Sequence, residues 1–286
     1  MADDLADIRT VSAEEYWKVF EKKWTSLLSY RYLGRRNSGL DTNDDGHGGE
    51  MPLRYDMRNL LGGIMAAPLC IASPEAGGMN DDNFVPNPVI ASMQILDDAK
   101  GVTGVKVLPE TLRLGRQMGF SRSLIVDAAN HKRVIAISEG MGVTLGPTPG
   151  NYEKIYNPPI DIADSPDLPP LHQVFGAERS ADGVWRLPPL SIEMASPDAA
   201  LHLGPQHIVL ETAAMEAAAT LAGTDRLQIQ SWHVQFAARG KVGPFRASAE
   251  AYGGTDDRVG VRLTLNDEGN EDRVVTSAAA VFRIVR

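Results

Sequence analysis

The sequence predicts an α+β fold built from two similar halves, a double repeat in which each half wraps an antiparallel sheet around one central helix. Three observations lead to this prediction. Short segments of the first half recur in the same order in the second half. The second half ends in four strand-like segments separated by Gly and Asp turns. An alanine-rich helical segment, residues 202–219, precedes those strands. A helix followed by consecutive strands suits a sheet that closes over the helix.

The internal repeat consists of three matching pairs of segments. "PLRYDM" at 52–57 matches "PLSIEM" at 189–194, and both alternate as strands do. "LGGIMAAPLC" at 61–70 aligns with "HLGPQHIVLE" at 202–211, each with a glycine near the start of a helical pattern. The segments that start at Ser123 and at Arg262 both have the pattern strand, polar turn, strand. The spacing between partners is nearly constant, and loop insertions explain its small drift.

The second half has the clearest strand pattern. After the helical segment come "DRLQIQSWHVQFAA", "GPFRASAEAY", "GVRLTLND" and "RVVTSAAAVFRIV", and each is bounded by turn residues. We expect these four segments to form the sheet of the second half. We also expect the two sheets to join into one, with the two central helices adjacent.

A leading helix precedes the first repeat. In "SAEEYWKVFEKKWTSLLSYRYL" Ser12 is a suitable N-cap. Large apolar residues then recur at helical spacing, namely Trp17, Phe20, Trp24, Leu27 and Leu28. We expect this helix to cover a core, and the "SGLDTNDDGHGGE" segment after it to form a loop.

The boundary between the halves is predicted at residues 146–170. "GPTPG", "NPP" and "DLPP" all occur there, and proline at this density continues neither a helix nor a central strand. Residues 1–145 then form the first repeat with its leading helix, 146–170 a proline-rich linker, and 171–286 the second repeat.

Composition narrows the class of protein. The 286 residues are 43% hydrophobic and 23% charged, which is typical of a globular protein. The longest apolar runs are too short to cross a bilayer, and the N-terminus is acidic, so we expect a cytoplasmic protein. The single cysteine, Cys70, rules out an internal disulfide and a Cys-rich zinc site. A net charge of −9 argues against general nucleic-acid binding. We predict no cofactor and no metal.

Glu211 is the unusual residue of the central helix in the second half. Ile208, Glu211 and Met215 stand at i, i+3 and i+7, so the carboxylate shares a stripe with two large apolar side chains. An unpaired charge in a core is costly, so this carboxylate must be paired, protonated or used in chemistry. An ordinary contact with His207, four residues earlier, is one possibility.

These segments resemble the hotdog fold, and specifically acyl-CoA thioesterases similar to the phenylacetate-pathway and 4-hydroxybenzoyl-CoA enzymes. The resemblance covers residues 189–286 and, more weakly, 52–145. That family has His-Gly-Gly at the start of the central helix and an acidic residue nine positions after the His. Here His202, Leu203 and Gly204 take the motif positions and Glu211 follows nine residues later. Leu203 departs from the family pattern.

In the first half, Leu61, Gly62 and Gly63 take the same motif positions, and Cys70 takes the position of the carboxylate. The resemblance implies sites shared between the halves, each with backbone donors from one helix start and a carboxylate from the other helix. One site would combine Gly62 and Gly63 with Glu211. We include Asn59 and Leu61 among the residues expected to contact its ligand.

The second site would combine His202 and Leu203 with Cys70, which offers no carboxylate, and Gly204 is expected among its ligand-binding residues. We therefore predict one working site and one degenerate site. The chemistry fits thioester hydrolysis, which needs N–H donors for the carbonyl oxygen and a carboxylate that attacks or activates water. Cys70 as a nucleophile is a weaker alternative, because no basic partner lies beside it in the sequence.

Other interpretations remain open from the sequence alone. "HGG" also occurs at residues 47–49, with Asp56 nine positions after His47, although Asp56 lies in the segment that matches "PLSIEM". The protein could bind acyl-CoA without hydrolysing it, or act as a hotdog hydratase or dehydratase. The expected partner is an acyl-CoA, with no nucleic acid and no membrane, and the chain could form a homodimer. Arg113, Arg116 and Arg122 are interpreted as a solvated face that could contact a phosphate.

Overall fold

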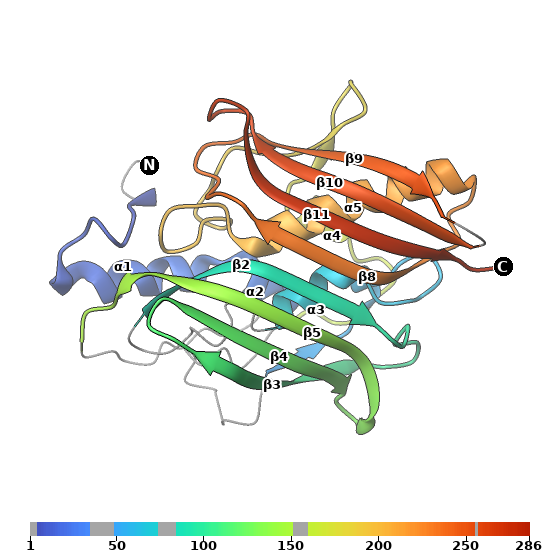
Figure 1. The fold of residues 1–286 in the computed structure, drawn as a ribbon, viewed down its shortest axis with the longest axis horizontal. Helices are drawn as coiled ribbons and strands as arrows, with labels where there is room; N and C mark the ends of the chain where they lie inside the picture. The colour runs from blue at the N-terminus through green and yellow to red at the C-terminus, as the bar shows by residue number, and fades with distance from the viewer. Residues whose placement is uncertain (1–4, 35–48, 74–83, 151–159, 255–256) are drawn as a thin grey trace.

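The computed structural model describes residues 5–34, 49–73, 84–150, 160–254 and 257–286. A single eleven-stranded antiparallel sheet dominates the fold, with the order β1-β3-β4-β5-β2-β8-β11-β10-β9-β7-β6 (Figure 1). The first half contributes one side of the sheet and the second half the other. Two strands join them, because residues 90–94 of β2 pair with residues 231–235 of β8. The prediction that the two sheets merge into one is confirmed.

The strands of the first half are β1 (Glu50–Pro52), β2 (Phe84–Ile95), β3 (Gly104–Leu114), β4 (Met118–Asp127) and β5 (Asn130–Pro147). Those of the second half are β6 (Glu178–Arg179), β7 (Trp185–Leu187), β8 (Leu227–Phe236), β9 (Phe245–Gly253), β10 (Arg258–Asp267) and β11 (Arg273–Ile284). The four strands predicted for the end of the chain are β8 to β11. Their alternation places Ile229, Leu263 and Phe282 on the buried face.

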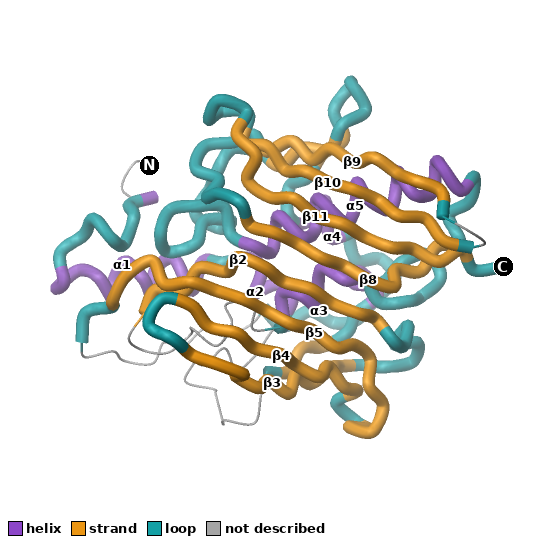
Figure 2. Tube along the Cα trace, viewed as in Figure 1, coloured by secondary structure: helices purple, strands orange, loops and turns teal. Residues whose placement is uncertain are grey.

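Two central helices lie beneath the sheet, side by side (Figure 2). The long helix α5 (Leu203–Ala222) belongs to the second half, and the short helix α3 (Ala66–Ala72) to the first. Every residue of α3 is buried. In α5, every residue from Leu203 to Glu211 is buried, because the helix is enclosed by α3 and by the sheet. One core cluster runs through both halves.

The leading helix has a break that the sequence did not indicate. Ser12 caps α1 (Ala13–Ser26) by accepting the Glu15 N–H, as predicted. Leu27 then adopts an extended conformation, and α2 (Leu28–Leu33) starts after it. The apolar side of α1 forms a second small cluster. Its members are Ile8, Tyr16, Phe20, Trp24, Leu27 and Val85.

The same backbone contacts occur at equivalent positions in the two halves, just before each central helix. The isolated bridge Arg58↔Ile64 recurs as Ala195↔Leu201. The hydrogen bond from the Met65 N–H to the Met57 carbonyl recurs from His202 to Met194. The N-caps of the two helices are therefore Met65 and His202, and the helix α3 begins four residues after the position that the Gly-Gly match predicted.

The prediction of a strand at residues 52–57 is wrong, because most of this segment forms a turn that leads toward the central helix. The strand β1 ends at Pro52, and Tyr55–Met57 forms the 3-10 turn η2. A hydrogen bond from the Met57 N–H to the Arg54 carbonyl closes that turn, and the one from Met194 to Ser191 closes its counterpart. The buried methionine at the end of each segment produced the apparent alternation.

The remaining segments frame these elements. The predicted linker lies between β5 and the short helix α4 (Leu171–Val174), although 151–159 of it are outside the described residues. His47 of the alternative motif is also outside them. Among the described helices, none is long and apolar enough to span a membrane.

Candidate active site

Glu211 lies where the two central helices meet. Its side chain is fully buried, and its Oε1 and Oε2 accept the backbone N–H groups of Ala66 and Ala67, at 2.8 and 2.6 Å. These are the first two residues of α3, whose N–H groups have no partner within the helix. Met65, the N-cap, offers no side-chain acceptor. A carboxylate of the second half thus caps the central helix of the first half.

This environment raises the pKa of the Glu211 carboxyl to about 7. Burial is the largest cause, because it disfavours the charged form. The two backbone N–H groups and the nearby His207 act in the opposite direction. The carboxyl therefore changes charge close to neutral pH, as a general base or acid requires.

His207, one helical turn before Glu211 in α5, forms a buried pair with Trp232 of β8. The indole Nε1–H of Trp232 in β8 donates to Nδ1 of His207 at 3.0 Å, and both side chains are fully buried. Nδ1 of His207 is therefore the acceptor in this pair. The pair fixes the imidazole beside the part of α5 that carries Glu211. No local sequence signal points to Trp232, which is distant in the chain.

The turn before α3 is built around Asn59. Its Oδ1 accepts the N–H groups of Leu61 and Gly63, at 3.0 and 2.9 Å, and its Nδ2 donates to the Leu227 carbonyl. Gly62 has a φ of 76°, which favours glycine, and a Cβ on Gly63 would overlap the Gln228 side chain. Gly62 and Gly63 thus form a turn against the start of β8. The prediction that they begin the helix is wrong.

The start of α5 is closed by other means. His202 caps its own helix, because its Nδ1 accepts the Gly204 N–H at 3.3 Å and also lies 3.1 Å from the Ser29 hydroxyl. The ring of Tyr30 packs edge-on against His202. A Cβ on Gly204 would overlap Ser29, so α2 lies directly over this helix end. Leu203 is buried in the core.

Cys70 is a buried core residue in the middle of α3. The register of the helix starts, extended along the sequence, aligns Glu211 with Pro74 and not with Cys70, which corrects the sequence match. Pro74 itself lies outside the described residues. The structure therefore brings together Glu211 and the start of α3, while Cys70 and His202 belong to other surroundings. Sequence reasoning did not identify Ala66, Ala67 and His207 as site residues.

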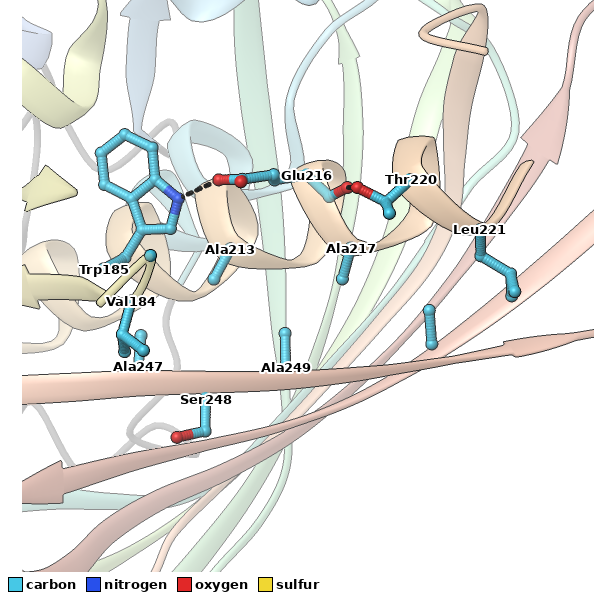
Figure 3. A pocket seen from close by; sticks show the side chains of 12 residues that line it. Val184, Trp185, Ala213, Glu216, Ala217, Thr220, Leu221, Ala247, Ser248 and Ala249 are labelled. Atoms are coloured by element: carbon cyan, nitrogen blue, oxygen red, sulfur yellow. Dashed lines mark hydrogen bonds between the residues drawn. The ribbon is translucent and has the colours of Figure 1, made fainter. Parts of the chain in front are cut away.

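A separate pocket of about 600 Å³ lies on the opposite side of α5 (Figure 3). Ala213 and Ala217 of α5 face Ala247 and Ala249 of β9 across it. The Trp185 indole N–H donates to the Glu216 carboxylate at one end. Glu211 is not among the lining residues, so this pocket is distinct from the candidate site. No group of three or more metal-ligating side chains occurs within the described residues.

Solved structures with the same architecture exist. A TesB protein of Mycobacterium avium subsp. paratuberculosis is 11% identical and superposes with a TM-score of 0.58, covering 90% of this chain and 98% of its own. An acyl-CoA thioesterase II, TesB2, of Mycobacterium marinum is 12% identical and superposes with a TM-score of 0.56, covering 91% of this chain and 97% of its own. A hot dog fold protein of unknown function from Alicyclobacillus acidocaldarius is 11% identical and has a TM-score of 0.55, covering 85% of this chain and 94% of its own.

The chain has a double hotdog fold. No protein-family model and no curated protein sequence matches it. At these identities the likeness establishes the architecture, and the chemistry has to be inferred from the site itself.

Proposed function

We propose that this protein hydrolyses acyl-CoA thioesters at the junction of α3 and α5. The observation that carries the proposal is the Glu211 carboxyl, fully buried, with a pKa of about 7, against the first N–H groups of a helix from the other half. A helix N-terminus is a suitable donor group for an oxygen that gains negative charge. Acyl-CoA as the substrate class is supported by the name of the Mycobacterium marinum neighbour.

The same donors serve two acceptors in this scheme. Without substrate, the Ala66 and Ala67 N–H groups bind Glu211. A thioester carbonyl oxygen that takes one of these donors releases a carboxylate oxygen beside the carbonyl carbon. Glu211 then attacks that carbon or takes a proton from an attacking water. If Glu211 takes the proton of water, the carbon–sulfur bond breaks as water adds, and Glu211 passes the proton to the leaving CoA thiolate. If Glu211 attacks, the carbon–sulfur bond breaks as an acyl–Glu211 anhydride forms, the CoA thiolate takes a proton from solvent, and water then cleaves the anhydride to the acid and free Glu211.

Substrate access requires side chains near Glu211 to move, because the carboxylate is fully buried. Met65 precedes Ala66, and Met215 lies one turn beyond Glu211 on the same stripe. Both are partly exposed and pack on the core. Methionine side chains change rotamer readily, so we infer that these two open the path to Glu211.

A non-catalytic acyl-CoA binding protein is the second candidate. The observation that favours it is that both carboxylate oxygens of Glu211 already have backbone donors. In that case Glu211 only caps α3 and ties the halves together.

Steady-state hydrolysis of an acyl-CoA panel, followed with a thiol reagent, separates the two candidates. For the best substrate we expect Glu211→Gln to lower kcat at least about a thousandfold, since the amide keeps the shape but not the reactive oxygen. Binding of that acyl-CoA should stay within about tenfold. Glu216→Gln, the same change on the opposite side of α5, is the matched control. Full activity of Glu211→Gln, or no turnover of any acyl-CoA by the wild type, would contradict the proposal.

A further inference from the structure

We propose that Arg258, Arg283 and Arg286, held in place by Arg226, form the subsite for the phosphate groups of CoA. This inference rests on the proposed function and identifies where the nucleotide end of the substrate lies. The four arginines come from the start of β10, the end of β11 and the residue before β8. All four are exposed.

The register of the sheet places two of these charges directly opposite each other. Arg258 and Arg283 are cross-strand partners, and both point to the outer face. Like charges in this position destabilise a strand pair. Such an arrangement is favourable when an anion lies between the two guanidinium groups.

Arg226 extends the cluster. Its Nε donates to the Val285 carbonyl at 3.0 Å and its Nη2 to the Arg286 carbonyl at 3.2 Å. The last residues of the chain are thereby fixed beside the start of β8. The backbone of Arg286 is thereby held beside Arg226, three residues after Arg283 in the chain.

The cluster differs from the other arginines of the sheet because two of its members, which have no ion pair within the described residues, are direct cross-strand partners. Several arginines of the sheet pair with carboxylates, as Arg122 does with Glu110, Arg133 with Asp97 and Arg246 with Asp272. Across the described ranges, neither Arg258, Arg283 nor Arg286 forms an ion pair. The acidic residues nearest to the cluster in the sequence are Asp225, Asp256 and Asp257, of which Asp256 lies outside the described residues. An unpaired cationic cluster on a chain with a net charge of −9 indicates a site for a multiply charged anion.

A short series of contacts connects the arginines to Glu211. Arg283 is the cross-strand partner of Gln228, whose Oε1 accepts the Asn59 side-chain N–H at 3.1 Å. Asn59 begins the turn that leads into α3. In Figure 1 the C-terminus and the start of β8 lie at the same end of the molecule.

The turn at residues 59–64 therefore lies between the arginine cluster and the Glu211 site. Ile64, the last residue of the turn, is two residues from Ala66, which is roughly 7 Å along the chain at most. We infer that the pantetheine arm crosses this turn, with the thioester at Ala66 and the phosphates at Arg258 and Arg283. Leu60, in the middle of the turn, is 83% exposed and offers an apolar contact for the arm.

Two other arginines, at the far end of the sheet, provide a matched control. Arg113 and Arg116, for which the sequence alone left a phosphate contact open, are exposed at the β3–β4 hairpin, and the strand registers place this hairpin at the other end of the sheet from Arg283. The strand β3 runs from beside β1 to that hairpin over 11 residues, which is roughly 35 Å. Removing these two charges changes the net charge by the same amount as removing Arg258 and Arg283.

Calorimetric binding of CoA, 3′-dephospho-CoA and pantetheine tests the subsite without relying on turnover. We expect Arg258→Ser/Arg283→Ser to weaken CoA binding about tenfold, a loss of about 1.4 kcal/mol. Pantetheine binding should stay within twofold, and so should CoA binding to Arg113→Ser/Arg116→Ser. The exposed positions keep the fold intact, which thermal unfolding of each variant verifies.

The outcomes separate this inference from the proposed function. Equal losses in the two double variants would mean that only net charge matters and would overturn the subsite. An equal loss for pantetheine, or no CoA binding by the wild type, would also overturn it. A selective loss of CoA binding in a protein that hydrolyses no thioester would support the subsite and reject only the proposed hydrolysis.

Discussion

The starts of the two central helices have the same backbone geometry but different closures. Both follow a turn with the same hydrogen bonds at equivalent positions of the repeat. At α3 the N-cap is Met65, which offers no acceptor, and the first donors bind Glu211 from the other half. At α5 the N-cap is His202, which caps its own helix beneath Ser29. A helix end that lacks its own cap leaves donors for another group to use.

The difference explains why one site per chain is expected. The donors at α3 have a titratable partner, whereas the end of α5 is occupied and covered by α2. The residue that corresponds to Glu211 in the sequence of the first half is Pro74, which has no carboxylate. The two halves thus share the scaffold, while the carboxyl that we propose to react occurs in one of them.

The largest expected effect is on the pH dependence of turnover. If ionised Glu211 is the reacting form, kcat should rise about tenfold per pH unit below its pKa of about 7 and level off above it. Rates for the best acyl-CoA between pH 5 and 9 provide the profile. A flat profile in which chemistry limits the rate would show that Glu211 is not the reacting group.

The free energy of unfolding provides an independent measure of the Glu211 pKa. Its dependence on pH should be opposite to that of kcat. The folded-state pKa is raised, so its contribution to stability is fully present below the unfolded pKa of about 4.5 and is lost as pH rises from there through about 7. A rise of this size corresponds to about 3 kcal/mol. The difference in unfolding free energy between wild type and Glu211→Gln, measured by urea unfolding from pH 4.5 to 8, should change by this order.

The His202 end should respond in stability and not in rate. His202→Ala removes the cap of α5 and the partner of Ser29, which should cost about 1–2 kcal/mol of unfolding free energy. The kcat should stay within about threefold, because the ring has no part in the α3 site. His202→Asn, which can still cap a helix, should recover most of the stability. A rate loss larger than tenfold in a folded His202→Ala protein would place the chemistry at α5.

The equivalent turns allow a smaller and reciprocal test. Gly62 and Ala199 occupy the same position of the repeat, with φ of 76° and 52°. Gly62→Ala should cost about 1 kcal/mol through backbone strain alone, because its Cβ would meet no atom within 4 Å. Ala199→Gly should gain a similar amount. Thermal unfolding of both variants measures the pair, and effects of the same sign would break the equivalence.

Much of the fold follows from the sequence because its signals are local. The turn residues around β8 to β11 and the alternating apolar residues define that half of the sheet. Glu211 was also predictable as a buried group, since Ile208 and Met215 flank it on one helix stripe. That it meets the other half was implied by the resemblance to hotdog thioesterases.

The rest depends on contacts between distant residues. The Gly62-Gly63 pair resembles a helix start, but Asn59 and Gln228 hold it as a turn. Met65 carries no capping signal in its side chain. The closure of α5 comes from Ser29, which is 173 residues away from His202 in the chain. Local pattern therefore assigns the helices but not which of their ends stays open to a ligand.

The central claim is that each chain has one reactive site, at the junction of Glu211 and the start of α3. Its most direct test is the binding stoichiometry of a non-hydrolysable acyl-CoA thioether, measured by calorimetry. We expect one equivalent per chain, and the same stoichiometry in a folded His202→Ala variant. The affinity should depend on pH in the wild type, and Glu211→Gln should remove that pH dependence. Two equivalents per chain, or loss of the bound equivalent in His202→Ala, would contradict it.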